Sequence, residues 1–588
     1  MAETAPRTLC EAFQRTAAAW PAAVALRTCG DEVTVTWREY VDRVRAIAGG
    51  LAWLGVGRGD VVALMMTNRP EFHLCDVAVL HTGATPFSVY NTSPPEVLGY
   101  QFGNADAKVV VCERRFLPVV RAGVERGGRV EHIVCIDGSV EGALSLAAVE
   151  AAPAMDFDFE AAWRAVVPDD LVTIVYTSGT TGMPKGVEIT HANLLASAEI
   201  AREIGGFGPD DRVVSYLPDA HMANRWVAHY ASMLYGIQIT TVADPARVVS
   251  ALTEVRPSIF LGVPRVWVKM RSALEAAART RPRVQRVSLG WAFGVGRRVA
   301  RAKSQRRRPD IADRLQRPVA DLLLARVRAG LGFDRVRIAV SAAAPIPVDV
   351  LEFVLGLGIP VCEAWGLTEG TCALTINRPD RIKAGTVGTP VPGARIRLAA
   401  DGEILARGPM IMRGYRKATK STEQAIDSGG WLHTGDIGSV DADGYLRIID
   451  RKKEIIINAA GKNMSPANIE NAVAAHTPLA GPVAIIGDGR RYNTALVTLD
   501  PDAVTEFARR HGLPTSVAVL SAHPRVRERI QAGVEAANAT LSRVEQIKTF
   551  RVLPDVWEPG GVFLTPTAKL KRASIASAYA ALIDEMYR

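Results

Sequence analysis

Several features of a secreted or membrane-spanning protein are missing from this 588-residue sequence. No stretch approaches the roughly 18 uninterrupted apolar residues that a membrane-spanning helix needs. The opening residues, MAETAPRTLCEAF, contain no basic region followed by an apolar run, so we expect no secretory signal. The seven cysteines are odd in number and include no C-x-x-C pair, which disfavours a disulfide framework and a zinc site. We therefore predict a cytoplasmic protein with reduced thiols.

An even distribution of charge is also missing. The formal net charge is +9, yet the segment from Arg279 to Arg317 alone contains thirteen Lys or Arg residues and only two acids, so the rest of the chain is close to neutral. Such a segment could bind nucleic acid, form a solvated insert or lie on an anionic membrane. Because no aromatic stacking ladder or nucleic-acid motif accompanies it, we expect no nucleic-acid partner. We predict peripheral contact with an anionic membrane, at the inner face of the cell membrane, with a solvated insert as the alternative.

The basic segment carries only a weak helical signal. Its apolar residues spaced by four, as on one face of a helix, are Val287, Trp291, Val295 and Val299. Its glycines, which weaken a helix, are Gly290, Gly294 and Gly296. We therefore expect a helix of mediocre amphipathicity here.

Short apolar runs separated by helical patterns dominate the first part of the chain. Examples are DVVALMM (60–66), AKVVVC (107–112) and LVTIVYT (171–177). Continuous apolar strands that alternate with helices indicate parallel sheets covered on both faces. From about 385 to 450, shorter strands with turn signals indicate a small antiparallel region instead.

The predicted fold class is α/β with two domains. Residues 1–449 would form a large N-terminal domain of stacked α/β layers with a small β region. Residues 450–588 mix strands such as VAIIG with helices, and would form a smaller α+β C-terminal domain. A chain of this length is too long for a single core, which supports the division.

The stretch YTSGTTGMPKG, from Tyr176 to Gly186, contains three glycines, four Ser or Thr hydroxyls and Lys185. Successive backbone N–H groups in such a turn form a concave site for anionic oxygens. The Walker phosphate loop requires glycine directly before lysine and then Ser or Thr, whereas Lys185 follows Pro184 and precedes Gly186. Taken alone, the stretch predicts a phosphate-binding loop of another kind, with an ordinary solvated loop as the alternative.

Four further motifs follow in order: WGLTEG (365–370), GGWLHTGDIG (429–438), IIDRKKEI (448–455) and TPTAKLKR (565–572). Together with the glycine-rich loop, they resemble the AMP-forming acyl-adenylate superfamily along nearly the whole chain. DSGGWLHTGDIGSVDADGYLRIIDRKKE is similar to the fatty acyl-CoA synthetase signature, and PSIFLGVPRVWVKM is similar to bacterial long-chain and bubblegum-like members.

The resemblance implies an AMP-forming ligase with ATP and Mg²⁺ as cofactors. It assigns the loop to pyrophosphate, through Thr177, Ser178, Gly179, Thr180, Thr181 and Lys185. It places Glu369 and Thr181 on Mg²⁺ and Thr368 near the α-phosphate. Trp365 and Ala343 would lie beside adenine, and Ala342 departs from a glycine that is usual in that turn, where a positive φ would strain alanine.

The resemblance also assigns the ribose and the catalytic group. Asp436 and Arg451 would hold the ribose hydroxyls, since a carboxylate accepts two hydroxyl donors and a guanidinium supplies several. Lys569 would be the catalytic lysine of the C-terminal domain, although Lys571 and Arg572 beside it also fit an ordinary basic tail. The C-terminal domain would be mobile and would rotate about Lys453 between the two half-reactions.

For the second half-reaction and the acyl chain, the resemblance implies a tunnel. His221 and Trp226 in LPDAHMANRW would lie at its gate, where Asp219 departs from an apolar residue, and Gly461 would line the path of the CoA arm. The predicted function is activation of a medium-to-long-chain fatty acid to acyl-AMP, then transfer to CoA as co-substrate. The alternative is an acyl-AMP ligase that transfers to a carrier protein.

Overall fold

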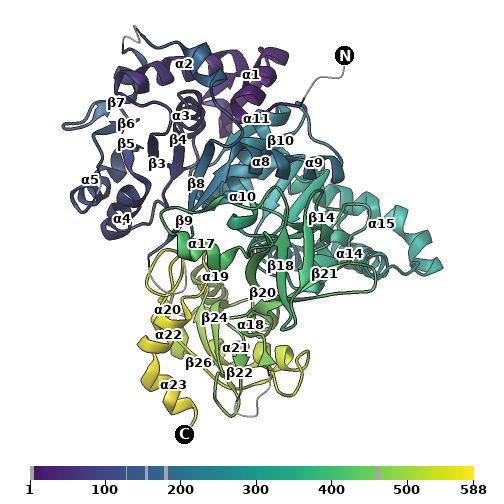
Figure 1. Ribbon diagram of the computed structural model, residues 1–588. Coiled ribbons are helices and arrows are strands. Elements are labelled where there is room, and N and C mark those ends of the chain that lie inside the picture. Colours follow the sequence, from purple (N-terminus) through teal and green to yellow (C-terminus); the bar gives the residue numbers. More distant parts are fainter. Residues whose placement is uncertain (1–4, 128, 153–155, 178–182, 459–462) are drawn as a thin grey trace.

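The computed structural model describes residues 5–127, 129–152, 156–177, 183–458 and 463–588. It divides into a large N-terminal part and a smaller C-terminal part, coloured yellow-green to yellow (Figure 1). Among the described residues, no helix is long and apolar enough to cross a bilayer. The predicted α/β class with a large and a small domain is confirmed.

A nine-stranded sheet forms the centre of the N-terminal part, in the order β16-β15-β14-β13-β12-β10-β11-β1-β2. Pairing is parallel from β14 to β1 and antiparallel at both edges. The strand bounds are β1 (Val24–Thr28), β2 (Thr34–Thr36), β10 (Arg212–Ser215), β11 (Gln238–Thr241), β12 (Ile259–Gly262), β13 (Ile338–Ser341), β14 (Val361–Trp365), β15 (Thr375–Ile376) and β16 (Thr389–Pro390).

The central strands are buried on both faces, as their continuous apolar sequences predict. Helices cover the central sheet in two layers, one on each face, and successive residues of a strand face different cores. In β12, Ile259 packs into the larger core on the side of the first layer, whereas Phe260 packs into the core on the side of the second layer. The helices of the first layer are α1 (Leu9–Ala19), α2 (Trp37–Trp53), α3 (Pro70–His81), α7 (Phe159–Arg164), α8 (His191–Ala198), α9 (Ile200–Glu203), α10 (Met222–Arg225) and α11 (Ala231–Tyr235). Those of the second are α12 (Val248–Val255), α13 (Pro264–Arg279), α14 (Arg283–Ser304), α15 (Ile311–Gly330) and α16 (Val348–Gly356).

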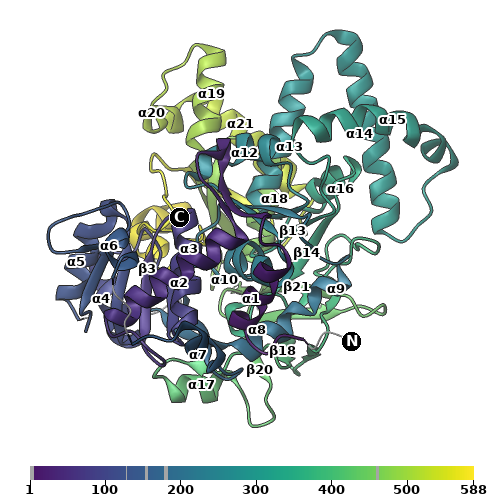
Figure 2. The same cartoon turned by 90° about the horizontal axis from the view of Figure 1, so that it is seen from above.

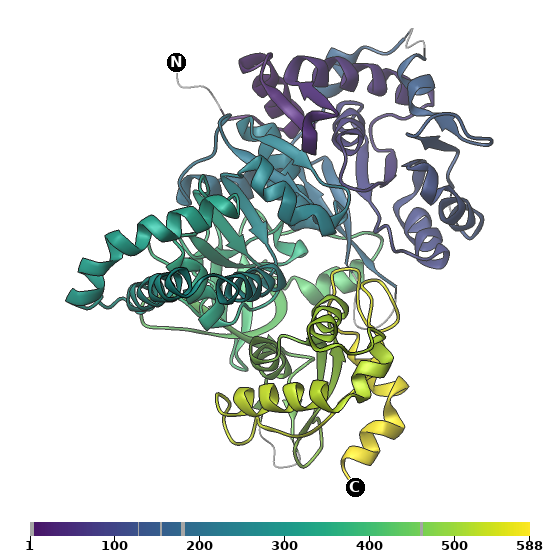
Figure 3. The same ribbon diagram turned by 180° about the vertical axis from the view of Figure 1, so that it is seen from behind.

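A second, wholly parallel sheet has the order β4-β3-β5-β6-β7. Its strands are β3 (Val61–Met65), β4 (Thr85–Ser88), β5 (Ala107–Cys112), β6 (His132–Cys135) and β7 (Leu144–Ser145), and the helices beside it are α4 (Pro95–Ala105), α5 (Leu117–Glu125) and α6 (Leu146–Glu150). This sheet lies on the opposite side of the molecule from α14 and α15 (Figures 1 and 3).

The run LVTIVYT differs from its prediction. It forms β8 (Leu171–Thr177), which pairs antiparallel with β9 (Lys185–Thr190), and β9 also pairs with β19 (Gly414–Tyr415). The prediction of a parallel strand was wrong because a continuous apolar run reports burial on both faces, and β8 is buried on both without parallel neighbours.

The predicted small β region is a four-stranded antiparallel sheet in the order β17-β18-β20-β21. It comprises β17 (Arg395–Leu398), β18 (Glu403–Arg407), β20 (Leu432–Val440) and β21 (Leu446–Arg451), with α17 (Thr419–Ala425) beside it.

The C-terminal part has cores of its own, which begin at Ile456. Its strands are β22 (Ile456–Ile457), β23 (Asn463–Met464), β24 (Ala480–Ile486), β25 (Asn493–Leu499) and β26 (Ile547–Val552). Its helices are α18 (Pro466–His476), α19 (Pro501–His511), α20 (Val517–Ala522), α21 (Pro524–Asn538), α22 (Arg572–Ala578) and α23 (Ala580–Met586). Their packing around β24 and β25 makes this the predicted smaller α+β unit.

The basic segment is more regular than predicted. Helix α14 runs unbroken for 22 residues despite its three glycines. One of them, Gly296, serves packing, because a Cβ there would lie 2.5 Å from the carbonyl oxygen of Gly356 on α16. The four residues of the predicted apolar stripe do not share one surface. Val295 and Val299 are buried, whereas Val287 and Trp291 are exposed.

A fully buried ion pair joins two helices of the first layer. The Arg225 guanidinium contacts the Asp76 carboxylate, donates to Ser88 Oγ at 2.7 Å, and donates to the Tyr230 hydroxyl at 2.9 Å. His229 Nε2 lies 2.9 Å from the other Asp76 oxygen. Burial alone would raise the pKa of Asp76, but Arg225 and His229 lower it, so the carboxylate stays charged.

We expect Asp76→Ala to lower the free energy of unfolding by about 3–5 kcal/mol, because it leaves the Arg225 charge buried without its counterion. Urea unfolding followed by tryptophan fluorescence measures this change. Glu96→Ala is the control, since Glu96 and Arg126 form an exposed pair at 3.2 Å, which is worth about 0–1 kcal/mol. Equal, small effects of both variants would contradict the prediction.

Candidate active site

The carboxyl ends of the parallel strands β10, β12, β13 and β14 meet at one edge of the nine-stranded sheet. In open α/β sheets, ligands bind at this edge. The segments that leave these strands there include His221, Val263–Arg265, Ala342–Pro347 and Gly366–Glu369, and all of them line one cleft of about 3600 Å³. The C-terminal part closes the other side of this cleft, which is several times larger than a typical small-molecule pocket.

Asp436, Arg451 and Trp365 form one connected group on the cleft wall. Asp436 is buried at the end of the β20–β21 pair, where its register partner is Arg451. Arg451 Nε lies 3.0 Å from Asp436 Oδ1, and Trp365 Nε1 donates to Oδ2 at 2.8 Å. The carboxylate is thus fixed in orientation and faces the cleft with acceptor capacity to spare.

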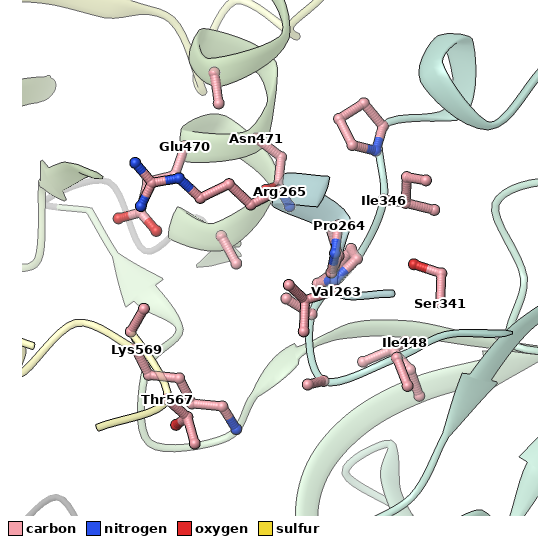
Figure 4. Close-up of a pocket in the computed structure, with 18 of the residues that line it drawn as sticks. Val263, Pro264, Arg265, Ser341, Ile346, Ile448, Glu470, Asn471, Thr567 and Lys569 are labelled. Atoms are coloured by element: carbon pink, nitrogen blue, oxygen red, sulfur yellow. The ribbon is translucent and has the colours of Figure 1, made fainter. Parts of the chain in front are cut away.

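The turn after β13 is strained at a different residue from the one expected. Ala343 has φ 73°, whereas Ala342 has no positive φ, so the left-handed position lies one residue further on. Strained residues of this kind gather at functional sites. Next to the turn, Ser341 Oγ is buried without a hydrogen-bond partner among the described residues. Figure 4 shows Ser341 facing the cavity, which makes it a polar group available to a ligand.

Glu369 reaches the cleft from the short 3₁₀ turn Thr368–Gly370, so Thr368 lies beside it. Its Oε1 accepts a hydrogen bond of 2.8 Å from the Tyr415 hydroxyl, and the Lys185 ammonium lies 4.8 Å from the Tyr415 ring centroid. Burial and then the Glu369 charge raise the pKa of Tyr415, so its hydroxyl remains a donor. Tyr415 was not predicted, because only the pairing of β19 with β9 brings it to the loop.

The glycine-rich loop connects β8 to β9, and its ends are placed by the pairing of Thr177 with Lys185. Both residues line the cleft. Ser178, Gly179, Thr180 and Thr181 lie outside the described residues. At the base of the loop, Lys185 lies over the ring of Tyr415, whose hydroxyl donates to Glu369.

Lys569 enters the cleft from the C-terminal part, on a tight turn that pairs Leu564 with Leu570. Ala568, directly before it, has φ 59°, and the Lys569 backbone N–H donates to Thr565 Oγ1 at 3.0 Å. The surrounding protein atoms, followed by the charge of Arg451, lower the pKa of the Lys569 ammonium, while Asp436, Glu454 and Glu369 raise it. Figure 4 shows the ammonium directed into the cavity opposite Val263 and Ser341.

Lys453 is the second residue after β21, and both of its neighbours form ion pairs. Lys452 pairs with Asp401 at 2.6 Å and Glu403 at 3.0 Å, which holds it to the N-terminal part. Glu454 contacts Arg572 of the C-terminal part at 3.3 Å. The chain therefore passes from one part to the other at Lys453.

The segment before α10 borders an apolar region of the cleft. Burial, and then the charge of Lys569, lower the pKa of His221 to about 4, so its imidazole is neutral. Trp226 begins a π-helical turn and donates from Nε1 to Ser197 Oγ at 2.8 Å. The apolar lining here includes Ile200, Ile204, Phe207, Trp226 and Val227. Gly461 lies outside the described residues.

Asp219, the unexpected acid of this segment, is absent from the residues that line the cleft. It is buried, and burial raises its pKa to about 7. Its Oδ1 accepts a hydrogen bond of 2.7 Å from Asn224 Nδ2. Asp219 therefore fixes the shape of the segment and leaves the apolar surface to its neighbours.

An ion pair across the cleft was not predicted at all. Arg265 Nη2, at the start of α13, lies 2.7 Å from Asp500 Oδ2, which caps α19, and Lys269 Nζ lies 3.5 Å from the same oxygen. Arg265 and Lys269 lie within PSIFLGVPRVWVKM, but that motif does not indicate Asp500 as their partner, because the contact depends on how the two parts are oriented. This pair is a direct link between the parts in the conformation shown.

Comparisons with known proteins agree with this architecture. The AMP-binding enzyme family model matches residues 13–416, and the model of the AMP-binding enzyme C-terminal domain matches residues 453–588. FadD11 of Mycobacterium tuberculosis, which carries a fatty-acid–CoA ligase name, is 50% identical over 76% of this chain and 79% of its own. The long-chain-fatty-acid–CoA ligase FadD15 of Mycobacterium bovis is 34% identical over 94% of this chain and 92% of its own.

Among solved structures, the anthranilate CoA ligase AuaEII in complex with anthranoyl-AMP superposes with a TM-score of 0.74. It covers 98% of each chain at 20% identity, a likeness that shows the fold alone. The two matched family models together span most of the chain, and the second begins at Lys453. The chain thus belongs to the AMP-binding enzyme family, the AMP-forming acyl-adenylate superfamily that its motifs resemble.

Proposed function

We propose that this protein activates a medium-to-long-chain fatty acid with ATP and transfers the acyl group to CoA. The observation that carries the proposal is a convergence in one cleft: Lys569 from the C-terminal part faces Asp436, Arg451 and Glu369 from the N-terminal part. Relatives named as long-chain-fatty-acid–CoA ligases support the choice of a fatty acid.

The nucleotide half of the cleft fits AMP by the chemistry of its side chains. Asp436 and Arg451 would bind the ribose hydroxyls, with Trp365 holding the carboxylate in place. The buried Ser341 hydroxyl, which no described residue hydrogen-bonds, and the strained Ala343 turn fit a site for the base. Thr177 and Lys185, with Ser178, Gly179, Thr180 and Thr181, would hold the leaving pyrophosphate.

Glu369 fits a site for Mg²⁺, which prefers one or two carboxylates together with substrate phosphates. Its Oε1 is oriented by Tyr415, and the described residues contain no group of three or more His, Cys, Asp or Glu that could hold a metal ion alone. When bound, Mg²⁺ would neutralise phosphate charge; Thr368 would contact the α-phosphate, and Thr181 would be a second protein ligand.

In the first half-reaction, a carboxylate oxygen of the fatty acid attacks the α-phosphorus of ATP, and the bond to pyrophosphate breaks. Negative charge builds on the α-phosphate during this step. Lys569 would stabilise that charge, since a preorganised cation acts most strongly where charge develops in a site shielded from water. In the second, the CoA thiol attacks the acyl carbonyl, loses its proton and displaces AMP.

The second half-reaction needs the Lys569 loop to leave the cleft. We propose rotation of the C-terminal part against the N-terminal part about Lys453, because Lys452 is paired with the N-terminal part and Glu454 with the C-terminal part. Hinges of this kind consist of a few connecting residues. Gly461 would then line the CoA path, and the Arg265–Asp500 pair would have to break.

The apolar region beside His221 and Trp226 would hold the acyl chain. A neutral His221 at its entrance costs less to bury beside hydrocarbon than a charged one would. We also propose that the enzyme is cytoplasmic and contacts an anionic membrane peripherally through Arg279–Arg317. The exposed arginines of this segment support that location.

The first prediction is a product pattern. With ATP, Mg²⁺ and a panel of fatty acids, we expect acyl-AMP without CoA and acyl-CoA with it, as measured by mass spectrometry. Acyl-AMP that CoA never captures would favour a carrier protein as acceptor. If no acid yields either product, the proposed function is wrong.

The second prediction concerns Lys569. Lys569→Ala should slow acyl-AMP formation by about 10²–10³-fold, the usual cost of one preorganised group at a developing charge. Transfer from supplied acyl-AMP to CoA should change little, and rapid-quench assays separate the two steps. Lys571→Ala is the matched control, because Lys571 Nζ donates to the Gly561 carbonyl at 2.8 Å. Equal losses in both variants would indicate a general effect of the basic tail.

The third prediction concerns the ion pair between the two parts. Asp500→Asn keeps the cap of α19 but removes the charge that faces Arg265, and the exposed guanidinium makes the pair worth about 0–1 kcal/mol. Acyl-AMP formation should slow by about two- to fivefold, whereas transfer to CoA should not slow. Glu506→Gln is the control, since Glu506 lies on the same helix and pairs with Arg510 of that helix at 2.8 Å. Slowing of both half-reactions by Asp500→Asn would refute a role in holding the first conformation.

A further inference from the structure

The helices α13, α14 and α15 form an arm at the side of the N-terminal part (Figure 2). The outer face of α15 is apolar without being covered. Its exposed residues follow a spacing of four, four and three, which places them on one side of a helix: Ile311 is 74%, Leu315 75%, Val319 57% and Leu322 70% exposed. Ala320 and Leu324, on the opposite side, are buried.

Helix α14 adds to this surface. Val284 is 81% and Val287 63% exposed, and Trp291 follows on the same side. Trp291 Nε1 donates to Gln316 Oε1 at 3.1 Å, which joins the two helices beside Leu315. The four most exposed of the large apolar side chains in the described residues all lie on this pair of helices. Patches of this kind mark interaction sites.

Unpaired cations flank the apolar side chains at both ends. Arg281, Arg283 and Arg286 surround Val284, while Arg308 and Arg314 lie near Ile311 and Leu315. These five arginines are exposed, and none forms an ion pair within the described chain. The nearby acids are largely engaged, since Asp313 pairs with Arg298 at 2.7 Å and Asp321 pairs with Arg317 at 2.8 Å. The surface is therefore apolar at its centre and positive around it.

We infer that this outer face of α14 and α15, which we call the arm face, docks on an anionic lipid bilayer. Ile311, Leu315 and Leu322 would enter the boundary between headgroups and acyl chains, and the flanking arginines would contact lipid phosphates. Charge complementarity selects this occupant over a second copy of the chain, because two positive surfaces of this kind would repel each other.

The position of the arm suits the proposed substrate. Ser272, Ala276 and Arg279 of α13 line the same cleft as Lys569, so the docked arm would hold the cleft beside the bilayer. A medium-to-long-chain fatty acid partitions into membranes, and the purpose of docking therefore rests on the proposed function. Docking itself does not require catalysis and is measured without it.

The test is co-sedimentation of the full chain with vesicles, without ATP or fatty acid. Vesicles of phosphatidylcholine with phosphatidylglycerol should bind the protein, pure phosphatidylcholine should bind it weakly, and high salt should release it. Leu315→Ser with Leu322→Ser should weaken binding at least tenfold, because both side chains lose insertion. Arg308→Gln with Arg314→Gln should weaken it by a similar factor, at about fivefold per cation.

Val249→Ser is the matched control, because Val249 is 65% exposed on α12, outside the arm, and this variant should bind like the parent. Circular dichroism should show all variants folded, as the changed residues are exposed. The inference is overturned if neither vesicle binds the protein, or if the leucine variant binds like the parent. A dimer in light scattering that the leucine variant dissociates would assign the face to a second copy. Salt-sensitive binding of a DNA oligonucleotide with no binding of vesicles would assign it to nucleic acid.

Discussion

Parallel pairing of β10, β12, β13 and β14 determines where the cleft lies. Because the strands run the same way, the four segments that leave them emerge at one edge, carrying His221, Arg265, Ala343 and Glu369 to the same cleft. The strands are buried on both faces, so the edge is among the few places where their ends meet a ligand. The strained Ala343 turn is held there by the surrounding sheet and can keep an unfavourable φ.

The remaining groups come from elements that the central sheet does not contain. Asp436 and Arg451 are positioned by antiparallel pairing in the small β region, Tyr415 by a two-residue strand, and Lys569 by a turn in the C-terminal part. A site divided in this way is complete only in one arrangement of the two parts. That division suits a two-step reaction, because moving one part removes Lys569 and leaves the nucleotide-facing groups in place.

Features that a local sequence pattern marks were predicted, whereas contacts between segments far apart in the sequence were not. Apolar runs identified buried strands, and the family motifs named Asp436, Arg451 and Glu369, which line one cleft in the structure. Their roles stay predictions, as do those of Ser178–Thr181 and Gly461, which lie outside the described residues. Tyr415 and the Arg265–Asp500 pair carry no local signal, since each depends on chain segments far apart in sequence. The strand β8 was assigned the wrong pairing because apolarity reports burial and not direction.

Intrinsic helix propensity alone gives the wrong prediction for α14, because of its glycines. On intrinsic preference they argue against a helix, yet Gly296 is where α14 approaches the backbone of α16 too closely for any side chain. Tight packing there buries Val295 and Val299, which removes them from the surface. The apolar side chains left exposed are those that the packing of α14 against α15 and α16 does not use. They lie on the outer side of α15 and the first half of α14. The arm face is thus a consequence of close helix packing. Counting charges along the sequence identifies this segment, but it does not identify which side of the helices is exposed.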